Sequence, residues 1–163
     1  MPTDEPADHE RPLPLDPDIE TGETTSGLPL AIHLNWRFIF LVGVGGACGT
    51  AARHLLGDAI GTTHDFPLGT FLINIFGAFA LGVLLECLAR SGSDAGHRRL
   101  LRLLLGTGFL GGFTTYSALA VDADTLLRTD HLGLALAYAG GTVAMGLMAS
   151  VAGIAIARKV VRS

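Results

Sequence analysis

The sequence predicts an all-α membrane protein of four transmembrane helices with the third helix broken in mid-span, and three observations support this fold class. Hydrophobic residues make up 49% of the 163 residues and charged residues only 16%. The charges gather between long apolar blocks, which is the pattern of membrane proteins. The third apolar block also contains glycines and threonines where a regular helix would be expected.

The four expected spans cover about residues 35–56, 67–89, 100–126 and 132–157. Each is close to the roughly 20 residues that a helix needs to cross a bilayer. Pro67 suits the first turn of the second span, and Gly45 and Gly49 form a GxxxG pair that favours close helix packing in lipid. Because four helices enclose little space, we expect a pore to form between chains.

The third span is interrupted by the stretch Gly106–Ser117, which holds four glycines followed by two threonines. Each glycine costs roughly 1 kcal/mol in a helix relative to alanine, so the pattern predicts a break in mid-span. Broken backbone is tolerated at membrane depth only where protein buries it or where it lines a polar cavity. Such breaks commonly coordinate ions or substrates, which indicates a transport protein.

Residues 1–30 differ in composition from the rest of the chain, being rich in proline and containing eight acidic residues. We expect a disordered tail there, and a transmembrane channel domain over residues 31–163. Four spans place both termini and the middle loop on one side. That side holds the basic residues Arg37, Arg90, Arg98, Arg99, Arg102, Arg158, Lys159 and Arg162, whereas Arg53 and Arg128 lie opposite. The positive-inside rule therefore predicts cytoplasmic termini.

An enzyme is not indicated by any motif in the chain. Gly106, Gly108 and Gly111 match the dinucleotide-binding fingerprint, but no strand precedes them and they lie inside a predicted span. No nucleophile with a neighbouring base is visible, and we expect no nucleic-acid partner.

Three motifs, Gly45–Arg53, Phe66–Gly77 and Gly106–Ser117, follow one another at proper spacing. They resemble the motifs of the first three helices of the small bacterial fluoride channels, the CrcB or Fluc family. The resemblance implies a bacterial cell-membrane protein that exports fluoride passively. It also implies an antiparallel dimer with two pores between the subunits and a structural sodium ion at its centre.

The resemblance further implies roles for particular residues. The sodium ion would be held by the backbone carbonyls of Gly111 and Thr114 of each subunit, and Arg53 would have a structural role at the end of the first span. The expected pore lining comprises Thr70, Asn74, Tyr116, Ser117, Leu119, Tyr138 and Thr142. The chemistry agrees, because a small, strongly hydrated anion needs compact amide and hydroxyl donors. The pairs at residues 70 and 74 and at residues 138 and 142 have i,i+4 spacing.

The third span departs from the family pattern at the positions of its two phenylalanines, which are Tyr116 and Leu119 here. The electropositive ring edges of phenylalanine suit an anion path, and leucine has none. The following serine and threonine positions are Ala118 and Ala120, and the usual glutamate is Asp122. Together with the strong charge bias, this favours a heterodimer with an oppositely oriented homologue over a homodimer.

Two other functions remain open. A proton-coupled exporter like the small multidrug-resistance proteins would need a carboxylate at the centre of the membrane, whereas Glu86 and Asp122 lie toward span ends. A non-conducting subunit that only completes a heterodimer is compatible with Leu119.

Simpler structural roles are also open for individual residues. Asn74 could bridge helices, and Thr70 and Thr142 could bond their own helix backbone. Glu86 could pair with Arg90 at i+4.

Overall fold

The computed structural model describes residues 35–63 and 65–161, and the expected tail over residues 1–30 lies outside them. Four helical segments are long and apolar enough to cross a membrane: Trp36–Ile60, Leu68–Arg90, His97–Arg128 and Leu132–Val160. The prediction of four spans is confirmed, although the first, third and fourth are longer than expected. Pro67 directly precedes the second helix rather than opening it.

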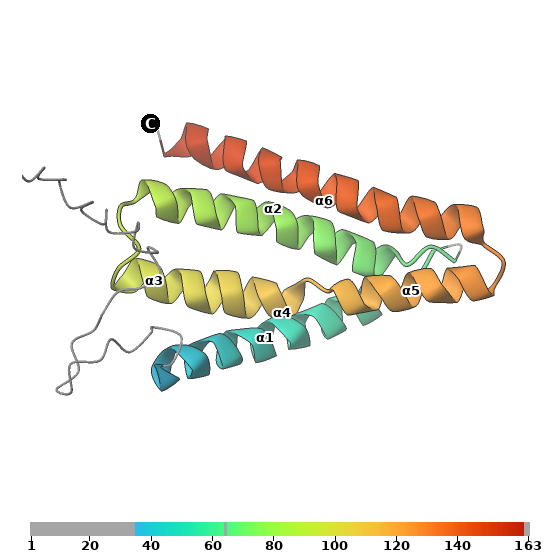
Figure 1. The fold of residues 1–163 in the computed structure, drawn as a ribbon, viewed down its shortest axis with the longest axis horizontal. Coiled ribbons are helices and arrows are strands. Elements are labelled where there is room, and N and C mark those ends of the chain that lie inside the picture. Colours follow the sequence, from blue (N-terminus) through green and yellow to red (C-terminus); the bar gives the residue numbers. More distant parts are fainter. Residues whose placement is uncertain (1–34, 64, 162–163) are drawn as a thin grey trace, which may run out of the picture. The chain divides into compact units, whose positions relative to one another are not determined.

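Three of these segments are single helices, α1 (Trp36–Ile60), α2 (Leu68–Arg90) and α6 (Leu132–Val160). The third consists of α3 (His97–Leu101), the π-helix η2 (Arg102–Leu110), α4 (Gly111–Phe113) and α5 (Tyr116–Arg128). Figure 1 shows the interruption between α4 and α5 in the middle of this segment. Within the described residues, the β-structure amounts to one isolated bridge between Thr63 and Phe66.

Glycines allow α1 to pack with its backbone against the third span. A Cβ atom built on Gly45 would collide with the carbonyl oxygen of Leu104, and one on Gly49 with that of Phe109. On the facing helix, a Cβ on Gly112 would collide with the carbonyl oxygen of Gly46. Small residues on both surfaces are how helices approach closely in lipid, so the predicted role of the GxxxG pair is confirmed.

The α2 and α6 helices lie side by side and run in the same direction (Figure 1). Glycine again sets their separation, because a Cβ on Gly82 would collide with the carbonyl oxygen of Ser150 and one on Gly153 with that of Phe79. Within the part of the chain that the structure describes, Gly140 and Gly141 on α6 have no such neighbour within 4 Å. They therefore do not serve helix packing within this subunit.

Two small apolar clusters contain residues from the two sides of the break in the third span. One contains Leu119, Leu126, Ala135 and Tyr138, and the other contains Ile73, Leu110 and Phe113. Most other large apolar side chains on the helices are exposed, which is the expected distribution for a chain whose outer surface meets lipid or another subunit.

Candidate functional site

The break in the third span falls at the two threonines and not at the glycines before them. Gly106 and Gly108 remain helical within η2, whereas Thr114 has ψ 157° and Thr115 has φ −151° and ψ 125°. Extended backbone suits β-branched side chains. The Thr115 hydroxyl then caps the restarting helix by accepting a hydrogen bond from the Ala118 N–H at 3.1 Å.

The side chain of Asn74 on α2 satisfies the exposed backbone of the break. Its amide nitrogen donates to the Thr115 carbonyl at 3.0 Å, and its oxygen accepts from the Thr115 N–H at 2.8 Å. Both backbone polar groups of Thr115 are thereby bonded. Asn74 therefore bridges α2 and the third span, which is the simpler structural role left open for it. One N–H of its amide remains available to a further acceptor.

The same contacts redirect two donors that a continuous helix would use. In an α-helix the N–H of residue i+4 bonds the carbonyl of residue i, so Gly111 would accept from Thr115 and Thr114 would accept from Ala118. Here those two N–H groups bond the Asn74 oxygen and the Thr115 hydroxyl instead. The carbonyls of Gly111 and Thr114 are therefore released from the helix ladder, and they are the pair for which the family resemblance implies a sodium ion.

The carbonyl of Gly112, one of the two between them, receives donors from α1. Arg53 Nε donates to it at 3.3 Å and Thr50 Oγ1 at 3.4 Å. Arg53 therefore crosses to the third span rather than only reaching toward a membrane surface. This contact agrees with the structural role expected of Arg53 and ties the end of α1 to the break.

A chain of hydroxyls runs across α2, α5 and α6. The Tyr138 hydroxyl, which is fully buried, donates to Asp122 Oδ2 at 3.0 Å, and the side chain of Thr70 bonds the same phenol. The Thr142 hydroxyl donates to the Tyr138 carbonyl at 2.6 Å, so it bonds its own helix backbone. Within this subunit, these hydroxyl protons are used internally.

The remaining predicted pore residues lie in opposite environments. Tyr116 is 82% exposed and Ser117 is exposed, whereas Leu119 is 7% exposed and packs in the cluster around Tyr138. Ser117 also lies 3.2 Å from the Thr115 hydroxyl. Tyr116 and Ser117 therefore face the surroundings of the subunit, while Leu119 belongs to its interior.

A cavity of about 290 Å³ brings part of the predicted set together between the end of α1, the start of α2 and α5. Its polar lining includes Arg53, His54, Asp58, Thr70, Thr115 and Asp122. Asp122 and Thr115 were not predicted as site residues. An acidic residue inside an apolar span is a signal for function, and it could have pointed to Asp122.

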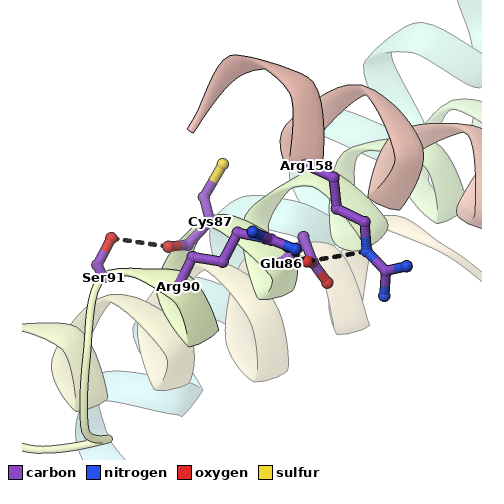
Figure 2. A network of polar contacts seen from close by, with 5 residues as sticks. All are labelled: Glu86, Cys87, Arg90, Ser91 and Arg158. Carbon is purple, nitrogen blue, oxygen red and sulfur yellow. Dashed lines mark hydrogen bonds and ion pairs between the residues drawn. The ribbon is translucent and has the colours of Figure 1, made fainter. Parts of the chain in front are cut away.

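A second polar network lies at the other end of α2, where Glu86 bonds two arginines (Figure 2). Arg90 Nε donates to Glu86 Oε1 at 2.6 Å and Arg158 Nε from α6 donates to the same oxygen at 3.0 Å. The predicted pair with Arg90 is confirmed. A carboxylate held by two arginines is poorly suited to exchange protons for a substrate.

Comparison with known proteins gives the family. Residues 40–154 match the family described as CrcB-like protein, Camphor Resistance (CrcB). The chain belongs to the CrcB family. The matched range includes the break, Asn74 and the Tyr138 network, and family membership together with the four apolar helices identifies a multi-pass membrane protein.

Curated relatives of this family carry the name of an ion channel. The chain is 54% identical over 125 residues to "Fluoride-specific ion channel FluC 2" of Leifsonia xyli subsp. xyli, covering 77% of this chain and 86% of the relative. It is 42% identical over 126 residues to "Fluoride-specific ion channel FluC" of Chelativorans sp., covering 75% and 97%. It is 45% identical over 109 residues to "Fluoride-specific ion channel FluC 1" of Cutibacterium acnes, covering 66% and 76%.

Proposed function

We propose that this chain is a subunit of a fluoride-selective channel that lets fluoride leave the cytoplasm passively. The observation that carries this function is the 54% identity to a fluoride-specific channel over most of both chains. Hydrogen fluoride enters cells as a neutral acid and ionises inside, so a selective leak is enough to lower cytoplasmic fluoride. The working unit is an antiparallel dimer in the cell membrane, with both termini of this chain in the cytoplasm.

The donors available at the subunit surface support an anion path beside the break. Asn74 keeps one amide N–H after bonding Thr115, and Tyr116 and Ser117 are exposed. Amide and hydroxyl donors match a small anion that must lose its hydration shell. Thr70, Tyr138 and Thr142 act behind this surface, because their hydroxyls bond one another, Asp122 or helix backbone.

A sodium ion at the dimer centre is supported by the backbone of the break. The Gly111 and Thr114 carbonyls lose their helical donors, and carbonyl oxygens are suitable ligands for a hard cation. Two carbonyls from each of two subunits would surround the ion. If this is correct, replacing sodium with N-methyl-D-glucamine lowers the dimer's unfolding temperature; equal stability in both salts would exclude the site.

The dimer is either a homodimer or a heterodimer with an oppositely oriented homologue, and the strong charge bias favours the heterodimer. Leu119 supports the same preference, because it is buried in its own subunit and presents no ring edge to an anion. The second candidate function, a non-conducting subunit that completes such a heterodimer, rests on this observation. In that case fluoride flux survives Asn74→Ala in this chain but not the matching change in the partner.

Bacteria that lack their own fluoride export test the proposal in cells. Expression of this chain, alone or with a homologous chain from the same cell, should restore growth in fluoride and lower cytoplasmic fluoride. Chloride sensitivity should not change. Failure of both arrangements, with the protein present in the membrane, would reject the proposed export function.

A further inference from the structure

The network around Glu86 places two guanidinium groups together at one end of the membrane-spanning helices. Arg90 lies in the last turn of α2 and Arg158 near the end of α6. Their Nε atoms bond the same carboxylate oxygen at 2.6 and 3.0 Å, so the two Nε atoms are less than about 6 Å apart. Figure 2 shows the two side chains approaching Glu86 from different helices.

The network keeps a net positive charge and unused donors. Among residues 35–63 and 65–161, one carboxylate balances only one of the two arginines, and each arginine bonds Glu86 through Nε alone. A guanidinium has five N–H donors, so the two terminal nitrogens of each side chain remain for another acceptor. The side chains of Arg90 and Arg158 are 30% and 58% exposed, whereas that of Glu86 is 15% exposed.

The chemistry of this site fits a phosphate group. Arginine is the preferred residue for phosphate because its fork of donors matches two phosphate oxygens. Charge-assisted N–H to oxygen bonds of about 2.8 Å allow one phosphate to reach two guanidinium groups at this separation. A carboxylate that holds both arginines in place orders the donors before the ligand arrives.

The surroundings indicate where the phosphate comes from. Apolar side chains near these helix ends are exposed, including Leu85 at 41%, Ile156 at 49% and Val160 at 68%. Apolar side chains do not stabilise a free anion, whereas they would contact the acyl chains of a lipid. Basic sites between transmembrane helices near the membrane surface are typical positions for anionic lipid headgroups.

We propose that Arg90 and Arg158, held by Glu86, form a binding site for the headgroup of an anionic phospholipid. The site is independent of the proposed fluoride path, which lies around Asn74 at the break. Bound lipid would fasten the ends of α2 and α6 to the membrane surface and to each other. The Arg128–Asp124 pair at the end of α5 is the matched comparison, since it is also an i,i+4 ion pair at 2.6 Å.

Native mass spectrometry of the full chain with phosphatidylglycerol or phosphatidylcholine tests this site. We expect stronger binding of phosphatidylglycerol, reduced about 5-fold by Arg158→Gln and about 25-fold when Arg90→Gln is added. Arg128→Gln should leave binding unchanged.

Three results would overturn the proposal. One is equal binding of the two lipids by the unmodified chain. Another is unchanged phosphatidylglycerol binding in the double arginine variant with normal helical content. The last is displacement of the lipid by millimolar inorganic phosphate at matched ionic strength, which would indicate a site for a free anion.

Discussion

Replacing Asn74 with alanine should destabilise the protein far more than loss of an ordinary contact between membrane helices. The side chain makes two hydrogen bonds, of 3.0 and 2.8 Å, and both go to the Thr115 backbone at the break. Alanine would leave the Thr115 N–H and carbonyl without a protein partner at the break.

The size of the effect follows from those two groups. A buried polar group left unbonded costs about 1–3 kcal/mol, so the Asn74→Ala variant should lose roughly 2–6 kcal/mol. A side-chain hydrogen bond between membrane helices contributes on average only about 0.6 kcal/mol. The two expectations are far enough apart for one experiment to separate them.

Reversible unfolding in mixed detergent micelles, followed by far-ultraviolet circular dichroism, measures this loss. Thr125→Ala is the control, because the exposed Thr125 hydroxyl bonds only its own helix backbone. Asn74→Asp should fall between Asn74→Ala and the unmodified protein, since it keeps the acceptor for the Thr115 N–H and loses the donor. A loss of 0.6 kcal/mol or less for Asn74→Ala would refute the claim that this side chain holds the break.

Four further substitutions test the packing and the hydroxyl network by the same unfolding measurement. Gly49→Ala should lower the free energy of unfolding by about 1–3 kcal/mol, because it forces α1 away from the third span. Gly140→Ala, with open space around it, should be neutral or stabilising, and equal effects of the two variants would contradict the packing account. Tyr138→Phe should cost about 1.5–3 kcal/mol, the value for a hydrogen bond to a charged group, because it removes the donor to Asp122; an unchanged stability would show that the bond contributes nothing. Leu119→Phe should cost about 1–3 kcal/mol by overfilling a packed cluster, and a stabilised variant would show that the position is not in the subunit interior.

The four spans could be predicted because they depend on length and hydropathy, which are local properties of the sequence. The stretch that holds the break, residues 106–117, could also be predicted. The residue at which the helix breaks could not, since glycine propensity alone favours Gly106 or Gly108. Packing decides otherwise: a Cβ on Gly108 would lie 2.9 Å from the Val42 carbonyl oxygen, so this glycine serves a close helix contact. The helix breaks instead at Thr115, whose hydroxyl can cap the next helix.

The partners of the polar residues depend on how helices distant in sequence are aligned. Asn74 and Thr115 are 41 residues apart, and Asp122 and Tyr138 are 16 apart. The spacing on one helix predicts which residues share a face, as at residues 70 and 74, but not which residue lies opposite. The pore roles assigned through the family resemblance therefore stay predictions, while the contacts of the same residues come from the fold.

Fluoride efflux from liposomes tests the central claim most directly. The purified chain is reconstituted alone and with a homologous chain, and released fluoride is followed with an electrode, with chloride as the control anion. The account predicts fluoride release without comparable chloride release in at least one of the two preparations. Release of both anions at similar rates, or of neither from a folded dimer of either composition, would contradict it.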